Sequence, residues 1–180
     1  CPFCRATTPE TNELRDKQRM KRIEANDPVA IGGQGTEQYE KGDYSGAFEY
    51  WKKAAEFGDV EAHCRLAAMY QLGRGVEKDR GKQMHHLEEA AIGGHPKARH
   101  LLGVKELGNG NVERAMQHHV IAAKQGEDDS IKMLMGAFKL GFVSKDILAS
   151  TLREHQAAVD ATKSPQREAA EERYRNRAKK

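Results

Sequence analysis

The chain has 180 residues, of which 32% are charged, but its formal net charge is only +3. This near balance excludes a strong field that would steer the whole molecule toward nucleic acid or a membrane surface. Valine, isoleucine and threonine are too sparse for many strands, and no apolar run approaches the roughly 20 residues of a membrane-spanning helix. We therefore expect a helical protein of one domain or a short repeat array, with no nucleic acid and no membrane among its partners.

A cysteine pair, Cys1 and Cys4, opens the chain with proline and phenylalanine between the two thiols. A C-x-x-C turn can aim two thiolates at one tetrahedral zinc ion. The segment Cys-Pro-Phe-Cys-Arg, followed by Pro9, resembles the last ligand pair of a RING-type zinc finger, so residues 1–9 are interpreted as its remnant. The other zinc ligands of such a finger would lie upstream, in keeping with a first residue that is not methionine.

This resemblance implies that the parent protein recruits a ubiquitin-conjugating enzyme and acts as a RING-type ubiquitin ligase. Zinc would be held by Cys1 and Cys4 only when the upstream ligands are present, and the alternative is a chance C-x-x-C at the end of the chain. For this chain alone we expect no cofactor and no catalysis. The third cysteine, Cys64, is expected to be an inert helix residue. So few cysteines, with no apolar signal segment, favour a cytoplasmic or nuclear location.

Residues 10–27 predict a charged linker or capping helix, and a helical repeat begins at residue 28. In each repeat two adjacent alanines follow a helical pattern and precede a glycine, at Ala54-Ala55, Ala90-Ala91 and Ala122-Ala123. This spacing predicts repeats over 28–59, 60–95 and 96–127, with a partial fourth over 128–141. Each repeat should form helix A, a turn and helix B, because the alanines allow two helix axes to approach closely.

Two short elements, Ala-Ala-x-x-Gly and Gly-x-Gly-Val-x-x-Asp, occur at positions set by the repeat. Examples are Trp51-Lys-Lys-Ala-Ala-Glu-Phe-Gly and Gly73-Arg-Gly-Val-Glu-Lys-Asp. In these elements the chain resembles the Sel-one-like repeat, a relative of the tetratricopeptide repeat, over roughly residues 28–141. The resemblance implies an all-α fold, a right-handed α-α superhelix (solenoid) of helix-turn-helix repeats. Its implied function is a protein–protein interaction scaffold for a protein or peptide partner.

The first repeat departs from the pattern because Gly32, Gly33 and Gly35 lie within its helix A. A glycine in a helix interior costs about 1 kcal/mol relative to alanine. We therefore expect a weak or frayed terminal repeat. A phosphate-binding loop is the alternative interpretation, but no strand precedes these glycines and no Gly-Lys-Ser/Thr follows them.

The A helices line the concave side of a stacked solenoid, which makes that side the predicted binding groove. The Leu66-type residue of each helix A faces helix B. Residues two positions away from it lie about 200° around the helix and point toward the groove: Thr36, Cys64, Ala68, His100 and Val104. By resemblance to tetratricopeptide repeats, the next turn adds Glu40, Gln71, Lys97 and Leu107. The predicted groove has mixed polarity and could take an extended peptide or a helix.

The histidines are predicted to be structural. Adjacent pairs such as His85-His86 point about 100° apart on a helix, whereas a metal site needs ligands on one face. A histidine metalloenzyme is the alternative, and it would require stoichiometric metal.

Residues 142–180 predict a C-terminal capping helix and a charged tail helix. Ser144 precedes a helix that carries Ile147, Leu148 and Leu152 and is expected to cover the open end of the last repeat. The basic end of the tail, residues 173–180, is interpreted as a solvated terminus, with a nucleic-acid or nuclear-import patch as the alternative.

Overall fold

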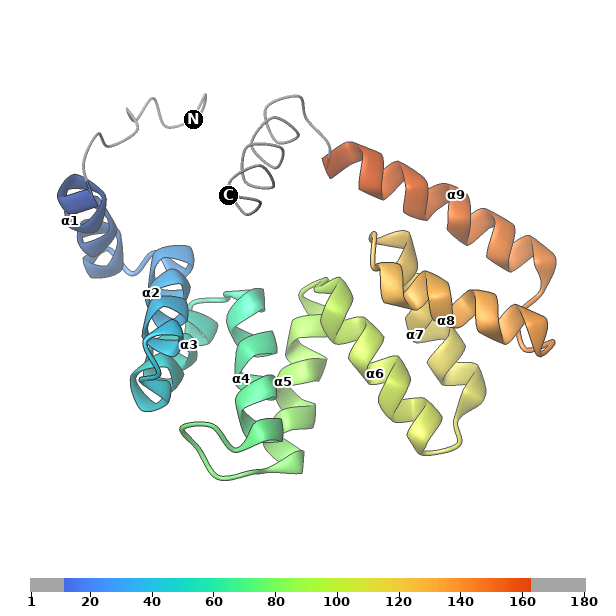
Figure 1. Cartoon of the computed structure of the whole chain (residues 1–180), viewed down its shortest axis with the longest axis horizontal. Coiled ribbons are helices and arrows are strands. Elements are labelled where there is room, and N and C mark those ends of the chain that lie inside the picture. The colour runs from blue at the N-terminus through green and yellow to red at the C-terminus, as the bar shows by residue number, and fades with distance from the viewer. Residues whose placement is uncertain (1–11, 163–180) are drawn as a thin grey trace, which may run out of the picture. The chain divides into compact units, whose positions relative to one another are not determined.

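The computed structural model describes residues 12–162, and all regular structure in this range is α-helical (Figure 1). The helices are α1 (Asn12–Glu24), α2 (Pro28–Glu40), α3 (Tyr44–Glu56), α4 (Val60–Leu72), α5 (Arg80–Ile92), α6 (Pro96–Gly108), α7 (Val112–Lys124), α8 (Asp128–Lys139) and α9 (Lys145–Thr162). Because these residues form no strand, the all-α fold class is confirmed. The chain divides into two compact units, Cys1–Gly93 with α1 to α5 and Gly94–Lys180 with α6 to α9.

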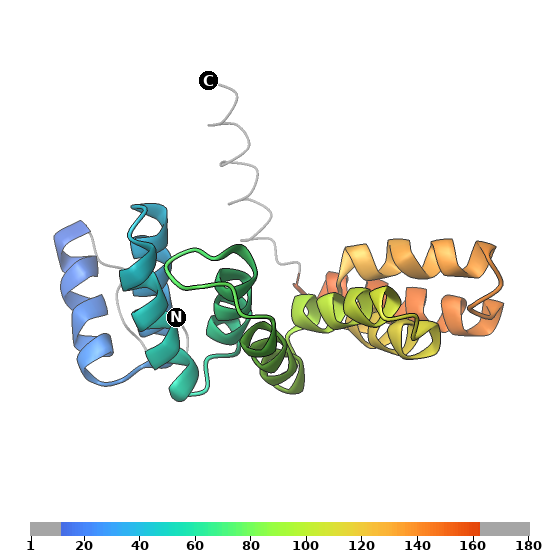
Figure 2. The ribbon, with the colours of Figure 1, turned by 90° about the horizontal axis from the view of Figure 1, so that it is seen from below.

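Helical hairpins are the building blocks of both units (Figure 2). α2 pairs with α3 and α4 with α5 in the first unit, and α6 pairs with α7 in the second. Local signals set the helix ends. Asp27 Oδ1, for example, accepts hydrogen bonds from the amides of Val29 and Ala30 at 3.0 and 3.2 Å, just before Pro28 starts α2. Gly58, between α3 and α4, has a φ of +85°, which favours glycine.

The glycines of α2 make room for Trp51 of α3. A Cβ added to Gly35 would lie 2.6 Å from Trp51 Cδ1, and the indole is only 2% exposed. Trp51 Nε1 donates a hydrogen bond to the Gly32 carbonyl at 3.1 Å. The helix therefore runs unbroken from Pro28 to Glu40, in contrast to the frayed helix expected from its glycine content. Packing against the indole compensates for the low helix propensity.

The second unit repeats this arrangement between Gly103 of α6 and His119 of α7. A Cβ on Gly103 would lie 2.8 Å from His119 Cε1, and the imidazole is fully buried. The equivalent positions in α4 and α5 hold Ala67 and Leu87, which are also buried. Glycine on helix A thus accompanies a ring on helix B, and alanine accompanies leucine.

The last two helices do not form another close hairpin. α9 has 18 residues and packs against both α7 and α8. His155 Nδ1 donates to the Ala123 carbonyl at 3.0 Å, and Lys124 Nζ pairs with Glu154 at 2.9 Å, so the middle of α9 is fixed to the end of α7. Leu148 packs on the buried cluster of this unit, whereas Ile147 and Leu152 remain exposed. The predicted capping helix therefore covers only part of the last repeat.

Candidate functional site

The predicted groove residues of the first unit differ in exposure. Glu40, Ala68 and Gln71 are exposed, and Thr36 and Cys64 are half-buried. The Thr36 hydroxyl donates to the Gly32 carbonyl at 3.2 Å. Three of these five side chains are therefore open to a partner.

In the second unit, two of the predicted residues hold helices together. Lys97 Nζ lies 3.2 Å from Glu127 Oε1 and 2.8 Å from Asp129 Oδ2. Hydrogen bonds from Lys97 and Lys132 lower the pKa of Asp129 to about 2. His100 is 8% exposed, and its Nδ1 lies 2.8 Å from Ser130 Oγ on α8.

Val104 and Leu107 complete the predicted set. Val104 is 43% exposed, whereas Leu107 is half-buried against the apolar cluster of the second unit. The structure thus places Val104 on the surface and His100 in the contact between α6 and α8.

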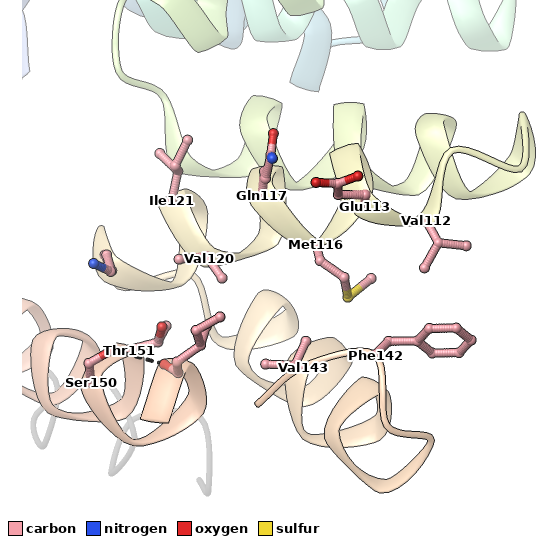
Figure 3. Close-up of a pocket in the computed structure, with 12 residues that line it drawn as sticks. Val112, Glu113, Met116, Gln117, Val120, Ile121, Phe142, Val143, Ser150 and Thr151 are labelled. Carbon is pink, nitrogen blue, oxygen red and sulfur yellow. Dashed lines mark hydrogen bonds between the residues drawn. The ribbon is translucent and has the colours of Figure 1, made fainter. Parts of the chain in front are cut away.

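A hollow that sequence reasoning missed lies between α7, the α8–α9 turn and the first turns of α9 (Figure 3). We call it the α7–α9 cleft, and its volume is about 750 Å³. Its apolar lining consists of Val112, Met116, Val120, Ile121, Phe142, Val143 and Ile147. Its polar lining consists of Glu113, Gln117, Lys124, Ser150 and Thr151.

Several apolar side chains of the α7–α9 cleft face solvent. Ile121 is 40% exposed, Ile147 47% and Phe142 59%. Thr151 is fully buried, and its hydroxyl has no hydrogen-bond partner among the described residues. The exposed apolar side chains are typical of a binding surface, whereas the Thr151 hydroxyl lies too deep for a ligand to reach.

The sequence contained one signal for this cleft. On α7, Val112, Met116 and Val120 follow one another at four-residue spacing, and Ile121 lies beside them. Met116 of this stripe belongs to the buried cluster of the second unit, and Val112 and Val120 pack against that cluster. The position of α9, which forms the opposite wall, depends on tertiary contacts and leaves no such pattern.

The histidines of α4 and α5 include one close pair. His63 Nδ1 lies 3.0 Å from His86 Nδ1, and the Tyr70 ring stacks on His86 with centroids 5.7 Å apart. Burial, followed by the nearby His63, lowers the pKa of His86 to about 4. Within residues 12–162, no three histidine, cysteine or acidic side chains are grouped so that they could hold a metal ion. Cys1 and Cys4, the predicted zinc ligands, lie outside the described residues.

Comparison with known proteins identifies the repeat. Residues 31–59, 60–95 and 96–127 each match the Sel1 repeat, while a search of curated proteins gives no match. No helix within residues 12–162 is both long and apolar enough to cross a bilayer.

Two solved structures resemble this chain, and each alignment covers 82% of it. A Sel1 repeat protein from Oxalobacter formigenes matches with 27% identity and a TM-score of 0.66. The protective antigen c5321 of uropathogenic Escherichia coli, which has an SLR fold, matches with 26% identity and a TM-score of 0.64. The alignments span 63% and 33% of those two chains. With Sel1 repeats over more than half of its length, the chain belongs to the Sel1 repeat family.

Proposed function

We propose that this Sel1 repeat protein is a protein-interaction scaffold that binds an amphipathic helix of a partner protein in the α7–α9 cleft. The observation that carries this proposal is the exposure of Ile121, Phe142 and Ile147 around one hollow of about 750 Å³. Large exposed apolar groups that gather in one place are typical of binding surfaces.

The character of the walls favours a helix over an extended peptide. Both long walls are α-helices, whose backbone groups are mostly engaged within the helices themselves. An extended peptide would bring its own amides and carbonyls against apolar side chains, where they would lack partners. A helix satisfies its backbone internally and offers one apolar face, so it fits this cleft.

The lining also indicates the chemistry of the partner. Val112, Met116 and Val120 span eight residues of α7, or about 12 Å, which matches two turns of a bound helix. Such a helix would present apolar residues at positions i, i+4 and i+7. Lys124 is already paired with Glu154, so the exposed Glu113 favours a basic residue at that end of the partner.

Selection from a displayed library of random peptides, with this chain as bait, tests the proposal. We expect enriched peptides with apolar residues at helical spacing, whose affinity falls at least about tenfold, or 1.4 kcal/mol, with the double variant Ile121→Asp/Ile147→Asp. Ile92→Asp is the matched control, because Ile92 is 77% exposed on α5, outside the cleft. Peptides that bind the double variant as tightly as the wild type would refute the cleft as the site.

The exposed groove residues supply a second surface for the same function. In the first unit these are Glu40, Ala68 and Gln71, which lie on the A helices α2 and α4 and are open to solvent. Alanine at Glu40 and Gln71, tested with the same selected peptides, separates this surface from the cleft. A loss of affinity in this variant alone would move the site from the cleft to the groove.

A RING-type ubiquitin ligase is the second candidate function, for the parent protein rather than for this chain. It rests on Cys1-Pro2-Phe3-Cys4-Arg5 alone. Further cysteines and histidines at RING spacing upstream of Cys1 would support it. The test is an assay of self-ubiquitination by the parent protein, which Cys4→Ser should abolish. Ubiquitin transfer that persists in this variant would exclude the ligase role for the motif.

A further inference from the structure

His155, in the middle of α9, has a hydrogen-bond acceptor at each ring nitrogen. Nδ1 lies 3.0 Å from the Ala123 carbonyl in the last turn of α7, and Nε2 lies 3.1 Å from Asp128 Oδ1 at the start of α8. A carbonyl and a carboxylate can only accept, whereas a neutral imidazole carries a single N–H. Only the protonated ring, with two N–H groups, therefore satisfies both neighbours at once.

The imidazole lies on the side of α9 that also builds the α7–α9 cleft. Ile147, Thr151 and His155 follow one another at four-residue spacing, so they share one side of the helix. Ile147 and Thr151 line the cleft, with Thr151 opposite α7 in Figure 3. The His155 side chain, one turn later, is only 13% exposed, so water does not readily replace either acceptor. Its two hydrogen bonds therefore fix one wall of the cleft.

Helix α9 has few apolar contacts that would hold it without these bonds. Thr151 is the buried residue of this helix, and Leu148 packs against the apolar cluster, but Leu152 remains exposed. Most of the stability of a helix in a protein comes from packing of an apolar face. The bonds of His155 therefore supply a large share of the attachment of α9.

We propose that protonation of His155 regulates the α7–α9 cleft, so that a partner helix binds more tightly at pH 6 than at pH 8. Histidine is the side chain whose charge ordinarily changes in this range. A neutral ring gives up one of its two bonds, and α9 is then detached in part of the population. The apparent affinity falls with the fraction of chains in which α9 stays attached. This inference rests on the proposed function, because it concerns the same cleft.

Other charged groups around the ring are already paired with each other. Lys124 of α7 forms an ion pair with Glu154 of α9. At the start of α8, Glu127 and Asp129 both pair with Lys97. The acceptor carboxylate and the carboxyl-terminal end of α7, whose dipole favours a cation, therefore remain to stabilise the charged ring.

The buried histidines of the same unit favour their neutral forms instead. Burial lowers the pKa of His119 to about 4, and it also lowers the pKa values of His100 and His118. At pH 6 the His119 ring is therefore neutral in the folded chain. Peptide affinity at this pH reports on His155, provided that circular dichroism shows a folded chain at both pH values.

Nitrogen-15 NMR of the imidazole rings in the whole chain, without peptide, measures the charge of His155. We expect both ring nitrogens to carry a proton at pH 6 and only one of them at pH 8. The variant His155→Gln identifies the signals. A ring that keeps the same charge at both pH values would overturn the proposal.

Calorimetric titration with a selected peptide measures the regulation. The peptide should lack histidine and have a blocked amino terminus, and it should bind at least about threefold more tightly at pH 6 than at pH 8. His85→Gln is the matched control and should keep this ratio, because His85 is exposed on α5. Asp128→Asn should abolish the ratio, since an asparagine amide can donate to the unprotonated Nε2 while Nδ1–H keeps its bond to the Ala123 carbonyl.

Failure of this inference differs from failure of the proposed function. If wild-type affinity is equal at both pH values, or if Asp128→Asn keeps the ratio, His155 does not regulate the cleft, although Ile121→Asp/Ile147→Asp still weakens binding. If binding does not depend on Ile121 and Ile147 at either pH, the proposed function itself fails, and this inference fails with it.

Discussion

Alanine at Gly35 is expected to lower the free energy of unfolding by about 3 kcal/mol, because its Cβ would overlap the buried indole of Trp51. Gly33 is the matched control within the same helix. It is exposed, and no atom lies within 4 Å of an added Cβ. Gly33→Ala should therefore raise the free energy of unfolding by about 0.5–1 kcal/mol. Urea unfolding followed by circular dichroism measures both changes.

A second substitution should relieve the overlap at Gly35. The pair Ala67 and Leu87 occupies the equivalent positions in the second repeat, so Trp51→Leu in the Gly35→Ala background reproduces a pair that already packs in this chain. We expect the two substitutions together to cost less than their sum, by about 1–3 kcal/mol. If the two changes in the free energy of unfolding simply add, or if Gly35→Ala alone is stabilising, then the packing of Trp51 does not require glycine at position 35.

Acidification from pH 7.5 to pH 5 is expected to destabilise the second unit through its buried histidines. Burial first, and then the neighbouring His100, lower the pKa of His119 from 6.5 to about 4. Burial also lowers the pKa of His100. Between pH 6.5 and about pH 4, the pKa values of His119 in the unfolded and the folded chain, only the unfolded chain binds the proton. The free energy of unfolding is therefore highest above pH 6.5 and falls as the pH drops. At pH 5 the loss from His119 alone is about 2 kcal/mol.

The variant Gly103→Ala/His119→Leu removes this imidazole and again uses the pair seen at Ala67 and Leu87. Its unfolding free energy should depend less steeply on pH between 7.5 and 5. Asp129, with a pKa of about 2, stays ionised over this range and adds no slope. Equal slopes for the variant and the wild type in urea titrations would show that His119 is not responsible.

The helices and their repeat could be predicted because their signals are local. Adjacent alanines mark helix B, and Asp27-Pro28 marks the start of a helix through its cap. Gly35 was the exception, because its effect depends on Trp51, 16 positions away. Helix propensity alone treats every interior glycine as a cost, and only the packed structure separates Gly35 from Gly33.

The candidate sites were harder to predict, because they depend on how repeats meet. The angle of His100 on α6 predicts that it faces the groove, but Ser130 of α8 lies within hydrogen-bond distance of it. The α7–α9 cleft exists because α9 packs against both α7 and α8 and does not pair with α8 as a regular helix B would. The periodicity of Ile147, Leu148 and Leu152 predicts an amphipathic helix but not which neighbour it covers.

The most direct measurement is a methyl NMR titration of the isotope-labelled chain with a selected helical peptide. If the α7–α9 cleft binds the helix, the methyl signals of Met116, Val120, Ile121 and Ile147 should shift together and saturate at one peptide per chain. Shifts confined to Val104 and Leu107, or to Met133 and Met135, with these cleft signals unchanged, would contradict the account.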